Sequence, residues 1–355
     1  MKLVPQRSSL IAQTANILRE GIRSGIWKDI LPGEFELCER LQVSRVTLRG
    51  ALEQLSREGL CSAGQGRRRR ITAKSATPSE EKSDRVVMLS PLPLQNLPAS
   101  AIFWVDALRD HLAAVGYTLE FVASQAAYSH HPGRALEVLV HQSRSAGWVL
   151  YLSTVELQQW FSERSLPCVI TGSRHPGVAL SSVDIDYSAT CSHAAGLLAA
   201  RHCQHLALLM PRSGHAGNIE SERGFLEATE KLSSLSARIA HHDGSVSGIC
   251  ATLDRLLRGN TPVDGLLVAK PAHVVTAVSH LLRRGVRLPQ DLSLISRDDD
   301  PLLEHLVPVV ARYHTDPVLF ARKISRLVLK LVSGGAQRSN DSRMRPELVR
   351  GETLG

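Results

Sequence analysis

The sequence has few aromatic residues and no long hydrophobic run. Phe, Trp and Tyr make up only 4% of its 355 residues, which argues against a surface that stacks the bases of single-stranded nucleic acid. No apolar run approaches the ~18 residues of a membrane span, and the opening MKLVP leads into no secretory hydrophobic segment. We therefore expect a cytosolic (cytoplasmic) protein with no membrane partner.

Cysteine is scarce, and its spacing fits neither a disulfide framework nor a common metal site. The six cysteines, at positions 38, 61, 168, 191, 203 and 250, form no CxxC pair. They are typical of reduced, packed thiols. The pairs His130-His131 and His241-His242 are interpreted as surface residues. One group contains both cysteine and histidine: Cys191, His193, His202, Cys203 and His205. Its spacing fits no closed zinc site, so we expect no metal and no cofactor.

Catalytic signatures are missing as well. The chain has no GxSxG, no glycine loop that would cradle a phosphate and no HExxH. Asp298, Asp299 and Asp300 could suggest hydrolytic carboxylates, but adjacent residues cannot stand ~5–9 Å apart across a glycosidic bond. We therefore expect that the protein is not an enzyme.

Positive charge is concentrated in the first fifth of the chain. Residues 1–74 hold 14 Lys and Arg against 7 Asp and Glu, whereas residues 75–355 hold 28 against 27. Such a basic segment is the electrostatic footprint of phosphate contact. A solvated basic face is the plainer alternative.

The pattern within that segment favours DNA binding. Apolar periodicity predicts a helix over about Ser9–Ser24, a short helix over Glu34–Leu41, and a third helix for which Ser44 is a good N-cap. A tight turn at Gln42-Val43 separates the last two, and Leu60–Thr72 is predicted to be a hairpin with the basic run RRRR. This is the order of a winged helix-turn-helix, which is mainly α with a β-wing.

Arg45, Thr47 and Arg49 lie early in the predicted third helix, after the N-cap Ser44, where a recognition helix presents groups to base edges. Arg45 and Arg49 can each bind the O6 and N7 of guanine with two hydrogen bonds, while Ser44 and Thr47 suit phosphates. For a single arginine the alternative is a solvated helix charge. The full order of elements favours DNA contact.

This segment closely resembles the N-terminal domain of the GntR family of bacterial transcriptional regulators over about residues 8–73. The shared pattern is LPGExxLxxxLxVSRxTLRxALxxLxxEGL and a glycine-containing wing. Phe35 departs from it, because the family usually has a polar or basic residue there. The resemblance implies a homodimer whose heads each read half of a palindromic double-stranded operator, with contacts from Ser44, Arg45, Thr47, Arg49, Gln65 and Gly66, and with Arg67 and Arg68 in the wing.

The rest of the chain predicts an α/β body. Residues 74–84 are polar and form a linker between the head (residues 1–73) and the body (residues 85–355). Strand and helix signals then alternate, which specifies parallel sheets covered by helices, and the length favours two lobes. The predicted strands are Val86–Leu89, Tyr117–Val122, Trp148–Leu152, Cys168–Thr171, Leu206–Met210, Gly265–Val268, Leu292–Ile295 and Val309–Tyr313. The predicted helices are Ile102–Val115, Ala135–Gln142, Val155–Phe161, Ser188–His202, Ile219–Lys231, Val246–Leu257, Ala272–Arg284 and Val318–Leu331.

The body resembles the LacI/GalR regulators over about residues 85–353. The resemblance is strong in GVRLPQDLSLISRDD (Gly285–Asp299) and moderate in Val183–Asp186, His205–Leu209, Gly224-Phe225 and Pro346–Arg350. It implies a periplasmic-binding-protein-like sensor that closes on a small molecule, usually a sugar or a nucleoside. Lobe 1 would comprise about residues 85–187 and 314–335, and lobe 2 about residues 188–313 and 344–355.

The resemblance also implies which residues line the ligand cleft. Asp298 is the strongest candidate, because a carboxylate at a strand end can accept two sugar hydroxyls; a loop-capping aspartate is the alternative. Ser221 replaces an expected arginine, and Lys270 stands where an asparagine or aspartate is common, so an acidic or phosphorylated ligand remains an option beside a neutral sugar. The implied residues are Ser90, Ser153, Ser173 beside Gly172, Asn218, Ser221, Lys270, Asp298 and His314.

Together these features predict a sequence-specific DNA-binding regulator, a repressor, whose operator binding responds to a sugar or sugar derivative. The alternative is an enzyme or carrier that a basic head tethers to nucleic acid. Steep salt dependence without sequence preference would favour that alternative.

Overall fold

The protein divides into two compact units, Met1–Glu81 and Lys82–Gly355. The computed structural model describes residues 10–23, 26–27, 30–62, 69–72, 83–232, 235–259, 261–335 and 339–355. None of the helices within these ranges is both long enough and apolar enough to cross a membrane.

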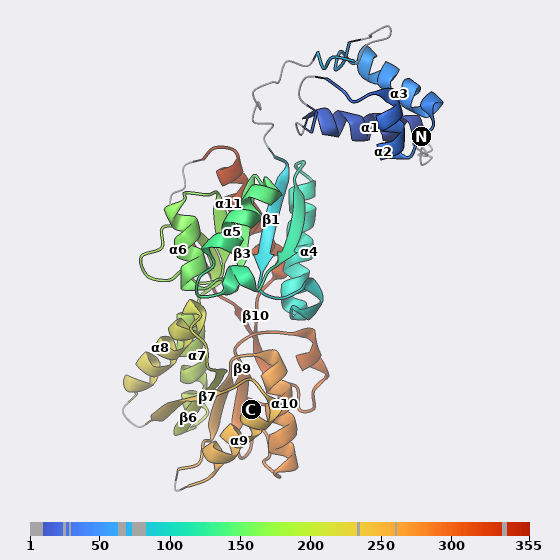
Figure 1. Ribbon diagram of the computed structural model, residues 1–355. Coiled ribbons are helices and arrows are strands. Elements are labelled where there is room, and N and C mark those ends of the chain that lie inside the picture. Colours follow the sequence, from blue (N-terminus) through green and yellow to red (C-terminus); the bar gives the residue numbers. More distant parts are fainter. Residues whose placement is uncertain are drawn as a thin grey trace. The chain divides into compact units, whose positions relative to one another are not determined.

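The first unit is a three-helix domain with a small β element (Figure 1). Helix α1 (Leu10–Arg23), α2 (Glu34–Leu41) and α3 (Arg45–Arg57) surround a core of buried residues that includes Leu18, Leu37, Leu48 and Leu52. Gln42 adopts a left-handed conformation with φ 50°, which ends α2 and turns the chain into α3. The predicted turn at Gln42-Val43 is therefore confirmed.

The arms of the predicted wing pair with each other. Antiparallel bridges join Cys61 to Ile71 and Ile30 to Arg70. The amide of Ser62 also donates a hydrogen bond to the carbonyl of Arg70 at 2.8 Å. The hairpin expected over Leu60–Thr72 is thus present in its arms, and its tip, residues 63–68, lies outside the described residues.

The second unit contains two six-stranded sheets. The first has the order β11-β5-β4-β3-β1-β2 and is entirely parallel. The second has the order β12-β10-β9-β8-β6-β7, and only β12 runs antiparallel to its neighbour. The strands of the first sheet are β1 (Arg85–Ser90), β2 (Thr118–Ala123), β3 (Gly147–Tyr151), β4 (Cys168–Thr171), β5 (Ser181–Ile185) and β11 (Asp341–Met344). Those of the second are β6 (His205–Pro211), β7 (Ser236–His242), β8 (Gly265–Val268), β9 (Ser293–Ser296), β10 (Ala311–His314) and β12 (Glu347–Val349).

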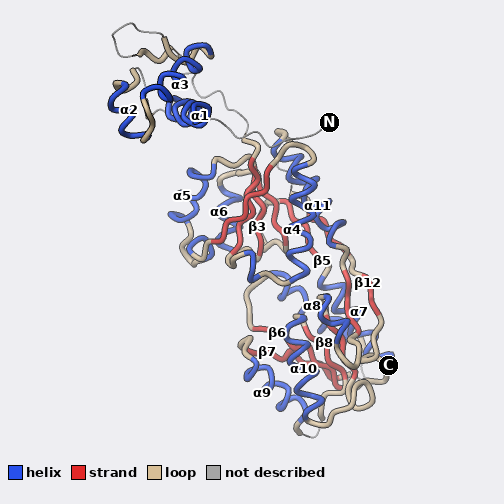
Figure 2. Tube along the Cα trace, turned by 90° about the vertical axis from the view of Figure 1, so that its right-hand side faces the viewer, coloured by secondary structure: helices blue, strands red, loops and turns tan. Residues whose placement is uncertain are grey.

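Helices cover both faces of each sheet. Helices α4 (Ala99–Ala113) and α11 (Pro317–Val332) cover one face of the first sheet, and α5 (Gly133–Ser143) and α6 (Val155–Glu163) cover the other (Figure 2). The second sheet lies between α7 (Tyr187–Ala200) with α8 (Ala216–Glu230) and α9 (Val246–Leu257) with α10 (Pro271–Arg283). Short 3₁₀ turns occur at Leu94–Asn96, Ala126–Tyr128 and Pro301–His305.

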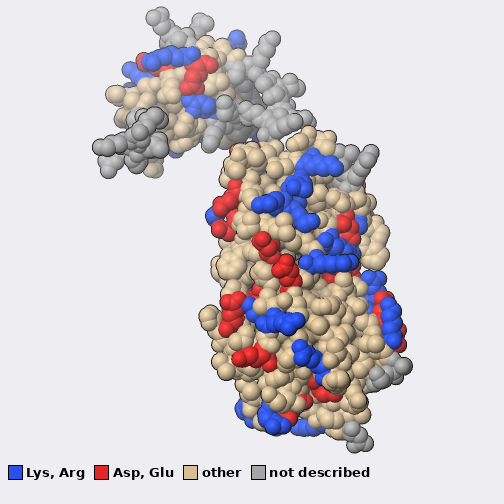
Figure 3. Space-filling view, turned by 180° about the vertical axis from the view of Figure 1, so that it is seen from behind, with Lys and Arg blue, Asp and Glu red and all other residues tan. Residues whose placement is uncertain are grey.

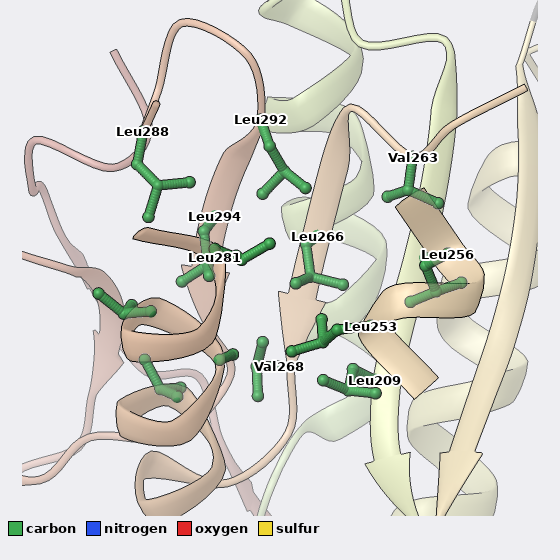
Figure 4. Packing of buried hydrophobic residues seen from close by; sticks show 14 of the residues in the cluster. Leu209, Leu253, Leu256, Val263, Leu266, Val268, Leu281, Leu288, Leu292 and Leu294 are labelled. Atoms are coloured by element: carbon green, nitrogen blue, oxygen red, sulfur yellow. The ribbon is translucent and has the colours of Figure 1, made fainter. Parts of the chain in front are cut away.

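Each face has its own apolar core, because both sides of these parallel strands are buried. In the second lobe, leucine and valine side chains of β6, β8 and β9 pack against α9 and α10 (Figure 4). The chain crosses between the lobes after β5, β10 and β11. The predicted two-lobed α/β architecture is confirmed.

The predicted strands and helices agree with the observed ones within about three residues at each end. The hydrophobic pattern predicts no strand at β5, β7, β11 or β12. β5 is a buried strand with the polar sequence SSVDI, and β7 is an edge strand with alternating burial. Both lack the continuous apolar run that marks the central strands.

Lys and Arg are interspersed with Asp and Glu over the surface of the second unit (Figure 3). This mixture matches the near-neutral charge of residues 75–355. The surface of this unit therefore has no broad basic face in the view shown.

Candidate functional site

Helix α3 presents the candidate DNA-contacting residues on its exposed face. Ser44 caps the helix, because its Oγ accepts a hydrogen bond from the amide of Thr47 at 3.2 Å. Arg45 and Arg49 are exposed, whereas Leu48 is fully buried and anchors the opposite face. The capped N-terminal half of α3 is thus held on the domain core with its polar face open.

Two neighbours from α2 position the arginines. The Nε of Arg49 donates to Glu34 Oε2 at 3.0 Å. The guanidinium of Arg45 lies 6.0 Å from the centroid of the Phe35 ring, which is 71% exposed. Phe35, the departure from the family pattern, is therefore an exposed aromatic beside a candidate DNA contact.

Sequence reasoning did not single out Val46, whose side chain is 79% exposed between Arg45 and Thr47. An exposed apolar side chain at this position can contact the methyl group of thymine. Its position in the sequence between two candidate DNA contacts could have indicated this role. The other predicted contacts, Gln65, Gly66, Arg67 and Arg68, lie outside the described residues.

Three of the predicted ligand residues meet around a buried arginine in the second lobe. Arg297 follows β9 and is 4% exposed. Its Nε and Nη2 donate to the two carboxylate oxygens of Asp298 at 3.0 and 2.8 Å. Its Nη1 donates to Asn218 Oδ1 at 3.2 Å and to Ser221 Oγ at 2.9 Å, and the guanidinium lies 4.3 Å from the centroid of the Tyr187 ring.

Arg297 is a candidate site residue that the sequence interpretation missed. Burial opposes the charged form of its guanidinium, but the adjacent carboxylate of Asp298 keeps the pKa of Arg297 above its usual value. Its guanidinium contacts the hydroxyl of Ser221, the residue that replaces the expected arginine. The available signal was an arginine next to Asp298 at a strand end, combined with the missing arginine at position 221.

Lys270 and His314 lie at two other strand ends of the same lobe. Lys270 is the exposed N-cap residue of α10, and partial desolvation of its ammonium group lowers its pKa, an effect that nearby Asp298 opposes. The Nδ1 of His314 lies 2.5 Å from Asp299 Oδ2, and Arg312 Nε donates to the other oxygen of Asp299 at 2.6 Å. His314 is therefore already engaged by an ion-paired carboxylate.

The predicted serines of the first lobe are bonded within the protein. Ser90 Oγ donates to the carbonyl of Leu92 at 2.8 Å, and Ser153 Oγ accepts from Gln158 Nε2 at 3.0 Å. Ser90 and Ser153 thus stabilise the turns after β1 and β3.

Ser173 lies where the two lobes touch. Its Oγ is 2.5 Å from Asp184 Oδ2 and 3.1 Å from Oε2 of Glu220, which belongs to α8 of the second lobe. Glu220 also accepts two hydrogen bonds from the guanidinium of Arg343 on β11, at 2.6 and 2.7 Å. Glu220 therefore links the second lobe to two elements of the first.

Two surface hollows of the second unit have volumes of about 320 and 300 Å³. The first is lined by residues 174–178, Asp341 and Arg343, and the second includes Arg212, His242 and Arg255. None of the eight predicted ligand residues lines either hollow. No group of three or more His, Cys, Asp or Glu side chains within the described ranges is arranged to hold a metal ion.

Two family models match this chain. Residues 10–71 match the bacterial regulatory proteins of the gntR family, and residues 195–354 match the periplasmic binding protein-like domain. The HTH-type transcriptional regulator CelR of Thermobifida fusca is 24% identical over 183 residues, which are 50% of this chain and 54% of that protein. The chain spans about half the length of the curated relatives that it matches.

Solved structures share the fold. A transcriptional regulator CelR–cellobiose complex has a TM-score of 0.68 at 19% identity and covers 98% of this chain and 100% of its own. A periplasmic binding protein/LacI transcriptional regulator of Alkaliphilus metalliredigens, in complex with D-xylulofuranose, has a TM-score of 0.64 at 16% identity and covers 76% and 99%.

The chain therefore combines a helix-turn-helix domain that matches the gntR family with a periplasmic-binding-protein-like domain. This is the domain composition of a transcriptional regulator, and not that of an enzyme.

Proposed function

We propose that this protein is a bacterial transcriptional repressor whose operator binding is controlled by a small molecule. The observation that carries the proposal is helix α3, which Ser44 caps and which presents Arg45 and Arg49 to solvent within a domain that matches the gntR family. We place its action in the cytoplasm, where the chromosome is. The alternative is a carrier that its basic head merely tethers to nucleic acid.

The regulator acts as a homodimer on a palindromic site, with one recognition helix in each half-site. A single winged head buries too little surface to read a complete operator tightly. Twofold symmetry in the protein would match twofold symmetry in the DNA.

The effector is a polyhydroxylated small molecule, a sugar or sugar derivative, held at the strand ends where the lobes meet. The cellobiose and D-xylulofuranose complexes of similarly folded proteins support this class of ligand. Asp298 keeps further acceptor lone pairs although both of its oxygens are bonded to Arg297. The ligand acts by favouring one arrangement of the lobes, which requires different affinities for the two arrangements.

Gel-shift titration on DNA from the protein's own promoter region tests this function. Arg45→Ala and Arg49→Ala should each weaken binding by about 1–3 kcal/mol at fixed salt, because each removes a base-edge or phosphate contact. Arg57→Ala, at the far end of α3, is the control, since Arg57 is highly exposed and only weakly paired with Glu53. Unchanged affinity in the double variant would reject the docking model, and binding without sequence preference would favour the tether.

A further inference from the structure

Basic side chains gather at one end of the second sheet. His242 is the last residue of β7, Lys270 follows β8 and caps α10, His273 lies in the first turn of α10, and His215 precedes α8. Lys270 interacts electrostatically with all three of these histidines. His175, from the loop after β4 in the first lobe, interacts electrostatically with His215.

Several of these imidazoles have buried nitrogens without a hydrogen-bond partner. His242 is 5% exposed, and its Nδ1 accepts a hydrogen bond from the amide of Gly244 at 3.0 Å. In the neutral ring the remaining proton is therefore on Nε2, which is buried and unpartnered. His273 Nδ1 and His175 Nε2 are also buried and unpartnered. Buried polar atoms left unpaired are rare and costly, so a group of them indicates a missing partner.

The nearby carboxylates already accept hydrogen bonds from other groups of the protein. Asp298 bonds to Arg297 through both oxygens. Asp243 accepts from the amide and hydroxyl of Ser245 at 2.9 and 2.7 Å, and Glu222 pairs with His241 at 2.9 Å. Among the described residues, no hydrogen bond or ion pair engages the ammonium group of Lys270.

The two imidazole rings of His242 and His273 pack edge to face, with centroids 4.5 Å apart. Lys270 stands at the N-terminus of a helix of 13 residues, where the peptide dipoles add positive potential. The site thus combines one unpaired cation, imidazole donors and a helix N-terminus.

We propose that the effector carries an anionic group, a phosphate or a carboxylate, which Lys270 and the adjoining imidazoles bind, so that the ligand is a sugar phosphate or a sugar acid. This inference rests on the proposed function, in which a sugar-like molecule binds between the lobes. It names the charge of that molecule and the residues that select it.

Anion binding at this site takes up protons. Burial, reinforced by Lys270 and neighbouring imidazoles, lowers the pKa of His215, His242 and His273, in the last case to about 4, while Asp243 partly opposes the effect at His242. These rings are therefore neutral near pH 7 in the free protein. A bound anion favours their charged forms, so affinity for the anion rises as the pH falls.

Sulfate is the first probe, because it stays a dianion between pH 5.5 and 8. Thermal unfolding and titration calorimetry of the full chain should show that sulfate binds the wild-type protein more tightly at pH 6 than at pH 8. Lys270→Met should weaken sulfate binding roughly tenfold or more, as expected for one charge-assisted contact. Lys231→Met, which removes an exposed lysine at the end of α8, is the matched control and also reports any general salt effect.

A second arm compares glucose 6-phosphate and gluconate with glucose. Tighter binding of the phosphate identifies the sugar phosphate, and tighter binding of gluconate identifies the sugar acid. The variant His273→Gln keeps the charge of Lys270 and removes one titrating imidazole, so it should make sulfate affinity less dependent on pH. This variant provides the test if Lys270→Met does not fold.

Three outcomes overturn the inference: no binding of sulfate to the wild-type protein, equal sulfate binding by the Lys270→Met and Lys231→Met variants, or equal affinity for glucose and both anions. If a neutral sugar binds between the lobes without dependence on Lys270, the inference fails while the proposed function stands. If the proposed function itself is wrong, the wild-type protein will show no sequence-specific DNA binding in the gel shift.

Discussion

At the scale of single residues, Arg297 shows how one substitution is accommodated by another side chain. The serine at position 221 is fully buried and leaves room for the Nη1 of Arg297, which donates to its hydroxyl at 2.9 Å. Asp298 neutralises the same guanidinium and Tyr187 lies against it. A buried arginine that makes all of these contacts fixes the orientation of the Asp298 carboxylate.

Replacing this arginine should be costly. Arg297→Met should lower the free energy of unfolding by about 3 kcal/mol, because it leaves Asp298 unpaired in a partly buried position. The double variant Arg297→Met/Asp298→Asn should recover part of that loss, since no unpaired charge remains. Urea unfolding of the three proteins measures both effects. A double variant less stable than Arg297→Met would contradict this account.

Asp184 should make stability depend on pH. The residue is 6% exposed, and burial raises its pKa from 3.8 to about 7, with Glu220 adding to the rise and the bonds from Ser173 and Ile185 opposing it. The folded protein thus holds a proton that the unfolded chain releases near pH 4. This contribution to stability is complete below about pH 4 and is lost as the pH rises towards 7.

The Asp184→Asn variant tests this linkage, because its amide mimics the protonated carboxyl. Relative to the wild-type protein it should gain stability between pH 5 and pH 8, by about 1.4 kcal/mol for each pH unit that is crossed below the folded pKa. Denaturant unfolding at several pH values measures the difference. Parallel stability curves for the two proteins would show that Asp184 does not titrate in this range.

At the scale of elements, the closest helix packing in the second lobe depends on a glycine. An ideal Cβ on Gly224 of α8 would lie 2.2 Å from the backbone oxygen of Ser188 and 2.6 Å from its Cα, both on α7. Backbone atoms cannot move aside as a flexible side chain can. The approach of α7 to α8 therefore requires glycine at this position.

Gly224→Ala should accordingly destabilise the second unit by about 1–3 kcal/mol through overpacking. Gly196→Ala on α7 is the control, because no atom lies within 4 Å of its ideal Cβ. That control should gain about 0.5–1 kcal/mol of helix stability. Thermal unfolding of both variants measures the two changes in stability. Equal changes for Gly224→Ala and Gly196→Ala would mean that α7 and α8 do not pack closely enough to require a glycine.

At the scale of the whole molecule, the two compact units divide the work. The first carries the basic excess and the candidate recognition helix, and the second, with its nearly balanced charge, carries the candidate ligand residues. The second unit has four apolar cores of its own. It is therefore large enough to fold alone, and we propose that it is also the dimerisation unit.

A fragment of residues 82–355 should still dimerise at micromolar concentration in a sedimentation experiment. Helices α4 and α11, which pack together, offer the exposed apolar side chains of Ile102, Phe103, Val318 and Leu319. The variant Phe103→Glu/Leu319→Glu should then be monomeric yet folded, because it charges that surface without touching the core. A monomeric wild-type fragment would show that dimerisation needs the heads.

The sequence by itself determined most of the elements and their order. The helix-turn-helix, the hairpin arms and the central strands were predictable because apolar periodicity, the Ser44 cap and the turn at Gln42 act over a few neighbouring residues. Strand β5 was not predicted, because its serines and Asp184 are polar and therefore resemble a loop in the sequence. In the folded protein they are buried, with Ser173 and β11 as their partners.

Tertiary structure alone decided which side chains share a site. Arg297 meets Asn218 and Ser221 across 79 and 76 residues of sequence, and Arg343 meets Glu220 across 123. The histidines around Lys270 come from three different strand ends. Local patterns cannot encode such pairings, because they arise only when parallel strands bring their carboxyl ends to one edge and burial removes the competing water.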